Sequence, residues 1–163
     1  MNRKLHDYPM VPKSADWLLP GHFWALPLSD GSYGCGRVIE VPAPAHRMNR
    51  MIFLAAVLDW RGANEPTSES IERLPCLAQG KAHIRAITRT GGTVLGWRDL
   101  DADGIEPWLF RGAELNPNSS VLRGCTPLRP QTPADTDLPV LSAWGYSFAV
   151  RIAEARFGLR AKV

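Results

Sequence analysis

The sequence predicts an α+β fold, a mainly antiparallel twisted sheet or partly open β-barrel with a short helix and a C-terminal amphipathic helix packed on it. Three observations predict it. Two apolar runs flank Asp30-Gly31, a dipeptide that readily adopts the positive φ angles of a tight hairpin turn. Glycine and proline, with 14 residues each, favour many short strands and turns. The clearest helical periodicity lies close to the C-terminus.

The chain is expected to form one domain. Its 163 residues are 45% hydrophobic and 21% charged, a balance that is typical of globular proteins and argues against disorder. A chain of this length buries enough surface to fold without disulfides or metal ions. We therefore expect a single domain over residues 1–163, with residues 1–20 as an N-terminal arm. Residues 126–139, which hold four prolines, are expected to be a stiff connection to the C-terminal helix.

The first two strands are predicted on either side of the turn. Residues 23–28 are apolar on both faces, which suits a strand that is covered on both sides, or an edge strand with Pro27 at the end that forms no ladder hydrogen bonds. Side chains alternate along the return strand, residues 33–41, and two glycines share one of its faces. Such a flat face is typical of a barrel corner, with a glycine-floored ligand site as the alternative. One face carries Tyr33, Cys35, Arg37, Ile39 and Val41, and the other carries Gly34, Gly36, Val38 and Glu40.

Further strands are predicted downstream. Residues 51–60 form a continuous apolar run, and their closeness to the hairpin favours a strand over a buried helix. Residues 83–89 alternate between polar and apolar, and together with residues 93–97 they predict a second hairpin. Residues 106–111 are expected to add another strand.

Two helices are predicted. The first covers residues 65–74, with Pro66 near its first turn and an end before Pro75. The second is the C-terminal helix, with Asp137 as its N-cap and Gly158 closing it. Its apolar stripe at 3.6-residue spacing, expected to face the core, consists of Leu141, Trp144, Phe148, Ile152, Ala155 and Leu159.

Charge and cysteine content exclude several classes of function. The net charge of +3 comes from 19 basic and 16 acidic residues, and the dispersed basic residues argue against a nucleic-acid partner. We expect no membrane span and no signal peptide, and hence a cytoplasmic protein. Cys35, Cys76 and Cys125 are odd in number and form no Cys-x-x-Cys pair, which favours reduced thiols over disulfides or a zinc site. No metal or cofactor is predicted.

An acidic segment is the strongest candidate for a charged contact with a partner. Asp99, Asp101, Asp103 and Gly104 match the first half of an EF-hand calcium loop. However, Phe110 stands at the twelfth position, where such a loop needs a bidentate glutamate. An acidic surface turn is therefore the preferred interpretation, and weak calcium binding is the alternative.

Three residues of the first hairpin are further candidates for partner binding. Tyr33 and Arg37 share one face of the return strand, and tyrosine and arginine are frequent among the residues that dominate protein interfaces. Asp30 lies at the turn itself. Ordinary cross-strand packing is the alternative interpretation of Tyr33 and Arg37.

The histidines leave an enzymatic alternative open. None has zinc-ligand spacing, but His22 or His83 could pair with Cys35 or Asp30 as a base beside a nucleophile. A pocket that joins His22 or His83 to two carboxylates would favour a hydrolase, whereas a flat surface would favour a binding protein. The four histidines of the chain are His6, His22, His46 and His83.

Residues 23–38 resemble the opening of the bacterial immunity protein 26 family. The shared pattern is an apolar strand with Pro27-Leu28, the Asp30-Gly31 turn and then Tyr-Gly-x-Gly-Arg-Val from Tyr33. The resemblance implies a small cytoplasmic α+β protein that binds and neutralises a cognate toxin. The family is grouped with a phosphotriesterase that hydrolyses coroxon, so a small phosphotriesterase-like hydrolase is the alternative. The pattern is a fold signature and implies no catalytic residues.

Overall fold

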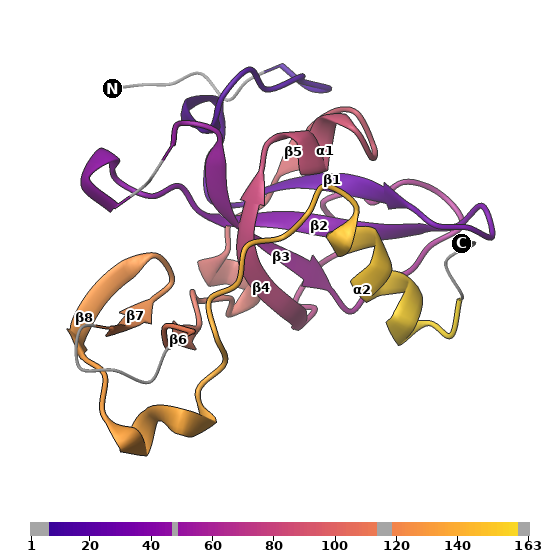
Figure 1. Cartoon of the computed structure of the whole chain (residues 1–163). Helices are drawn as coiled ribbons and strands as arrows, with labels where there is room; N and C mark the ends of the chain where they lie inside the picture. Colours follow the sequence, from indigo (N-terminus) through magenta and orange to yellow (C-terminus); the bar gives the residue numbers. More distant parts are fainter. Residues whose placement is uncertain (1–6, 47–48, 114–118, 160–163) are drawn as a thin grey trace.

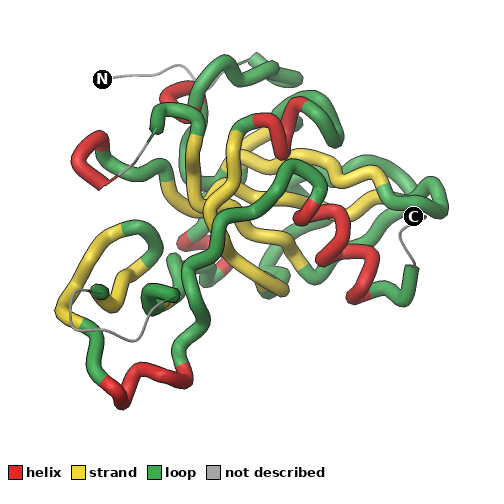
Figure 2. The backbone as a smooth tube through the Cα atoms, viewed as in Figure 1, coloured by secondary structure: helices red, strands yellow, loops and turns green. Residues whose placement is uncertain are grey.

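The structure is a computed structural model that describes residues 7–46, 49–113 and 119–159. Within them it is an α+β fold of short strands, short helices and long loops (Figure 2). The elements in chain order are η1 (Ala15–Trp17), β1 (His22–Pro27), β2 (Tyr33–Glu40), η2 (Pro44–His46), β3 (Ile52–Leu58), β4 (Cys76–His83), α1 (Arg85–Thr88), β5 (Gly96–Trp97), η3 (Asp101–Asp103), β6 (Leu109–Phe110), β7 (Ser120–Arg123), β8 (Thr126–Pro130), η4 (Pro133–Asp137) and α2 (Phe148–Arg156).

The main sheet has five antiparallel strands in the order β4-β3-β2-β1-β5. The predicted hairpin is confirmed: β1 pairs with β2, and Gly31 at the turn has a φ of 85°. The predicted strand over residues 51–60 is confirmed as β3, which pairs with β2 and β4. A second sheet, in the order β6-β7-β8, lies at the lower left of Figure 1. The two sheets do not close into a barrel.

The main sheet is buried on both faces, which explains the apolar character of β1 and β3 on both sides. The helix-side cluster includes Trp24 and Phe53 together with Ala149 and Ala153 of α2. The opposite cluster, here the small-sheet-side cluster, includes Phe23, Cys35, Leu54, Phe110 and Cys125.

A β-bulge near the end of β2 changes the face of the sheet on which the last side chains of the strand lie. The pairing of β2 with β3 shifts between Val38 and Glu40, so that Glu40 lies opposite Leu54 of the small-sheet-side cluster. Val41 packs against the helix-side cluster instead. Strict alternation therefore predicted the wrong face for both Glu40 and Val41, because one extra residue in a strand reverses the alternation that follows it.

The glycine face of β2 is filled by protein side chains. A Cβ atom on Gly36 would overlap with the indole ring of Trp24. A Cβ atom on Gly34 would lie 3.2 Å from the Cβ of Ala153 on α2. The two glycines thus allow a tryptophan and a helix to approach the sheet closely, and they form no ligand-binding floor.

The C-terminal helix is packed on the main sheet, as predicted, but its bounds and buried face differ. It begins after Ser147 and not after Asp137, and its buried residues are Ala149, Ala153 and Glu154. Phe148 of the predicted stripe is 42% exposed. Small side chains meet in this contact, because Ala153 of α2 packs directly over Gly34 of β2. The predicted closure is confirmed: Gly158 has a φ of 70°, and the backbone N–H of Leu159 donates to Glu154 at 2.8 Å.

Residues 65–74, predicted as a helix, form turns instead. Thr67 and Ser70 exchange hydrogen bonds between side chain and backbone, which competes with helical pairing. Arg73 has a φ of 56°, a left-handed conformation that ends any helix at this point.

The predicted second hairpin over residues 83–97 is also wrong. His83 ends β4, and the chain turns at once into α1, so that only Gly96–Trp97 joins the sheet, beside β1. The predicted strand over residues 106–111 is shortened to β6. The proline-rich segment 126–139 is more than a connection, because it includes β8 and η4.

Candidate functional site

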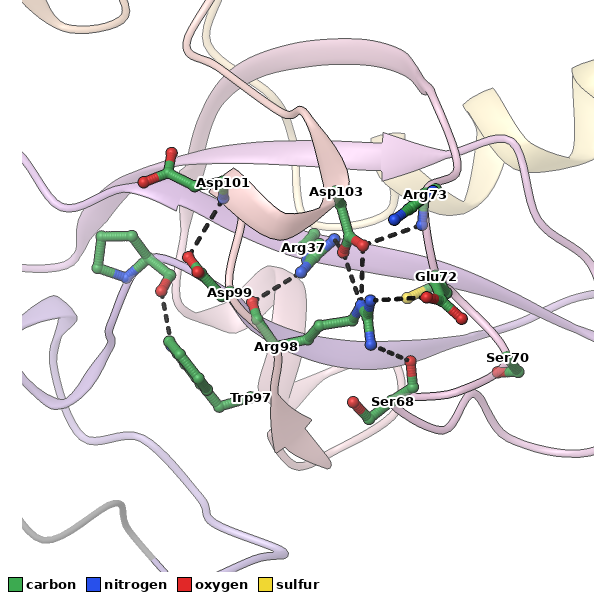
Figure 3. A network of polar contacts seen from close by, with 12 residues as sticks. Arg37, Ser68, Ser70, Glu72, Arg73, Trp97, Arg98, Asp99, Asp101 and Asp103 are labelled. Atoms are coloured by element: carbon green, nitrogen blue, oxygen red, sulfur yellow. Dashed lines mark hydrogen bonds and ion pairs between the residues drawn. The ribbon is translucent and has the colours of Figure 1, made fainter.

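A buried ion pair connects β2 to the predicted acidic turn (Figure 3). The side chains of Arg37 and Asp103 are both fully buried, and Nη1 of Arg37 donates to Oδ2 of Asp103 at 2.6 Å. Nη2 of Arg37 donates to the backbone carbonyl of Arg98 at 2.7 Å. Arginine is rarely buried without a charged partner. Its position in an apolar strand is thus explained by the carboxylate it meets.

Asp103 is the centre of this network. Nε of Arg98 donates to its two oxygens at 2.9 and 2.8 Å, and the backbone N–H of Arg73 donates to Oδ1 at 2.9 Å. Burial opposes ionisation of this carboxyl, but the hydrogen bonds from Arg73, Arg37 and Arg98 outweigh it and lower its pKa. Asp103 is therefore an ionised anchor that joins η3, β2 and the turn at residue 73.

The anchor divides the acidic turn into an inner and an outer part. Asp103 points inward, and Gly104, with a φ of 67°, reverses the chain behind it. Asp99 and Asp101 are exposed, and the backbone N–H of Asp101 donates to Oδ1 of Asp99 at 3.2 Å. Among the described residues, neither outer carboxylate forms an ion pair. Two negative charges are therefore held at the surface by a rigid support.

The arrangement does not resemble a calcium loop. The oxygens of Asp103 accept hydrogen bonds from Arg37, Arg98 and the backbone of Arg73, and those donors occupy the directions that a cation would need. The described residues include no group of three or more His, Cys, Asp or Glu that could hold a metal ion.

A groove of about 700 Å³ opens beside the turn, between β4 and the small sheet. Gln79 spans its floor: its Nε2 donates to the carbonyl of Glu106 at 2.9 Å, and its Oε1 accepts from the backbone N–H of Trp108 at 2.9 Å. Two arginines and an indole give it a mixed polar and apolar lining. The lining includes Arg73, Cys76, Gln79, Glu106, Trp108 and Arg123.

Asp30 and Tyr33 lie at the other end of β1, apart from the acidic turn. Asp30 is held by the hydroxyl and backbone N–H of Ser32 and by an ion pair with Arg61. Tyr33 is half-buried, and its backbone exchanges hydrogen bonds with Gly62. The candidate residues thus occupy two separate places, and Arg37 lies in the interior, where it cannot reach a partner.

The histidines do not form the arrangement that would favour a hydrolase. His22 is buried, with Nδ1 accepting from the backbone N–H of Leu19 at 2.9 Å and Nε2 lying 3.0 Å from the hydroxyl of Tyr8. Nδ1 of His83 accepts from the backbone N–H of Arg85 at 3.1 Å. Neither histidine lines the groove beside the acidic turn or the hollow bordered by Tyr8, Phe23 and Trp97. His6 lies outside the described residues.

Arg98 and Arg73 were not predicted as part of this site. Arg98 reaches Asp103 across a turn of five residues, a spacing with no regular periodicity. One signal was available: an arginine in the middle of an apolar strand, such as Arg37, requires a buried carboxylate elsewhere in the chain.

Comparison with protein families gives a match to the model described as Immunity protein 26, over residues 19–121. The chain belongs to the immunity protein 26 family. The match covers more than half of the chain and includes the whole Arg37–Asp103 network, whereas β8, η4 and α2 lie beyond it. No curated protein and no solved structure matched this family member. Among its described residues, no helix is long and apolar enough to cross a membrane.

Proposed function

We propose that this member of the immunity protein 26 family binds a cognate protein toxin and neutralises it in the cytoplasm, as part of competition between bacteria. Membership of an immunity protein family carries the proposal. The inhibitor acts by covering a surface of the toxin. A net charge of +3 argues against an acidic mimic of nucleic acid, so a nuclease toxin would be blocked locally or allosterically.

The acidic turn is the contact surface that we propose. Its outer carboxylates, Asp99 and Asp101, are exposed and unpaired among the described residues, and the buried network beneath them limits their motion. Charged groups held in this way accelerate the approach of an oppositely charged surface and add specificity. Arg37 and Asp103 serve the contact indirectly, by positioning the turn.

The hairpin end is a second proposed contact. Asp30 is exposed there, and Tyr33, at the start of β2, is half-buried. Because Asp30 is already paired with Arg61, this contact has less free charge than the acidic turn. We expect it to add area to the interface more than electrostatic attraction.

The test begins with capture of the toxin from a lysate of the source bacterium by the tagged protein, followed by purification of both partners. Co-expression should restore growth of cells that make the captured protein. Asp101→Asn should weaken the complex about two- to fivefold, chiefly through slower association. The matched control is Asp137→Asn, which removes one exposed carboxylate from another 3₁₀ helix, η4.

Two results would contradict the proposal. A captured protein that does not harm cells, or whose toxicity the immunity protein leaves unchanged, would remove the toxin-neutralising function. Equal effects of Asp101→Asn and Asp137→Asn would remove the acidic turn from the interface, while leaving neutralisation itself intact.

A further inference from the structure

A basic and aromatic patch lies where α1 meets the chain that leads into α2 (Figure 1). The Cζ atoms of Arg85 and Arg89 lie 5.8 and 5.1 Å from the centroid of the Tyr146 ring. These distances are those of cation–π contacts. The ring of His83, at the end of β4, lies 5.4 Å from the same tyrosine ring. We name these four residues the arginine–tyrosine patch.

The positive charge of the arginine–tyrosine patch is not neutralised. Arg85 and Arg89 are exposed, and neither side chain has a hydrogen bond or ion pair among the described residues. Partial burial and the positive charges of both arginines lower the pKa of His83. Six other described arginines pair with carboxylates, and four do not. The paired ones are Arg37, Arg50, Arg61, Arg98, Arg129 and Arg156.

The ring of Tyr146 holds the two guanidinium groups in an orientation suited to binding an anion. A guanidinium that rests on an aromatic ring has lost part of its rotational freedom before binding, while its N–H groups stay available at its edge. Two such groups beside one ring can each donate paired hydrogen bonds to a carboxylate. Phe148, which is 42% exposed, follows two residues later and adds apolar surface.

The size of the patch favours a protein ligand over a nucleic acid. Nucleic-acid sites neutralise several successive phosphates along a basic track. Here two arginines stand together, and most other arginines of the described surface already have carboxylate partners. Arginine and tyrosine side by side are typical of the centres of protein interfaces.

We propose that the arginine–tyrosine patch is a docking surface for an acidic segment, rich in aspartate and glutamate, of a partner protein. The carboxylates of that segment bind the edges of Arg85 and Arg89, and Tyr146 holds these groups in place. The patch is separate from the acidic turn, and its ligand has the opposite charge. It therefore goes beyond toxin neutralisation through that turn and does not depend on it.

Binding of a fluorescently labelled peptide of alternating glutamate and aspartate, measured by fluorescence polarisation at low salt, tests the proposal. Arg89→Ala should weaken binding by about fivefold, the effect of one charge-assisted contact at a surface. The matched control is Arg151→Ala, which removes one exposed arginine of α2 that also has no ion pair among the described residues. That control should change binding less than twofold.

Variants of Tyr146 distinguish the orienting effect of its ring from the charge of the two arginines. Tyr146→Ala leaves both arginines in place and should still weaken binding severalfold, whereas Tyr146→Phe keeps the ring and should bind like the wild type. Thermal unfolding of each variant confirms that it is folded, which is expected because Tyr146 is exposed.

Three outcomes would overturn the proposal. They are the absence of peptide binding by the wild type, equal losses in Arg89→Ala and Arg151→Ala, and binding of labelled oligothymidine that exceeds peptide binding and is lost in Arg89→Ala. The last would assign the patch to nucleic acid. Because no toxin is used, these outcomes leave the proposal for the acidic turn untouched.

Discussion

Among the charged residues of the site, Asp103 is the one whose substitution should lower the stability of the fold most. Replacing it with asparagine leaves the guanidinium of Arg37 buried without a counter-charge. Breaking a buried pair in this way costs about 3–5 kcal/mol. We expect Asp103→Asn to lower the free energy of unfolding by that amount in urea denaturation. Asp99→Asn, four residues away and exposed, should change it by less than about 0.5 kcal/mol. Similar small losses in both variants would contradict the anchoring role.

Asp30 makes the stability of the folded protein depend on pH in the acidic range. Hydrogen bonds from the side chain and backbone of Ser32, and the contact with Arg61, lower the pKa of Asp30 from 3.8 to about 2. Because its folded pKa lies below its unfolded value, its contribution is present above pH 3.8 and is lost as the pH falls towards 2. The difference in unfolding midpoint between wild type and Asp30→Asn should therefore shrink over that interval. A difference that stays constant would show that Asp30 titrates alike in both states.

At the scale of elements, the docking of α2 depends on small side chains. Ala153 is fully buried against the glycine face of β2, so Ala153→Leu introduces a side chain for which no space exists. Such overpacking costs about 1–3 kcal/mol. Hydrogen exchange of the α2 amides should accelerate in this variant. Ala155→Leu, two residues later and exposed, is the matched control because alanine and leucine have similar helix propensity, and it should leave exchange unchanged.

Elements were predictable where their signals were local. The Asp30-Gly31 turn and the flanking apolar runs are enough to place β1 and β2, and Gly158 marks the end of α2. The helix expected over residues 65–74 failed because Arg73 adopts a left-handed conformation, with its backbone bonded to a carboxylate thirty residues away. The apolar stripe was right in part: Trp144, Ile152 and Leu159 belong to or pack on the helix-side cluster, whereas Phe148 is exposed. The close approach of Ala153 to Gly34 was missed, because no helical periodicity reveals it.

The site was predictable only in part, for the same reason. The acidic turn was recognised from its three aspartates, but local spacing cannot show that Asp103 points inward while Asp99 and Asp101 point outward. That division is decided by Arg37, which lies 66 residues earlier in the chain. Long-range pairing of this kind leaves no periodic trace in the sequence.

For the whole molecule, Glu40 is a link between the two sheets. Its Oε2 accepts a hydrogen bond at 3.1 Å from the backbone N–H of Cys125, in the turn between β7 and β8. We expect Glu40→Ala to accelerate hydrogen exchange in β7 and β8 while leaving β3 unchanged. Glu69→Ala, which removes an exposed glutamate carboxylate that has no side-chain partner among the described residues, is the control. Uniform acceleration in both sheets would mean that the sheets open together and that Glu40 is no separate link.

The bulge in β2 has a consequence for insertions and deletions. One extra residue sends the carboxylate of Glu40 towards the turn at Cys125 and leaves Val41 for the helix-side cluster. If Ile39, the extra residue, were deleted, β2 would alternate regularly from Val38 to Val41, with Glu40 still opposite Leu54 and Val41 still on the helix side. A one-residue deletion is therefore expected to be tolerated better at the bulge than earlier in β2, where it would turn the residues between the deletion and the bulge to the opposite face of the sheet.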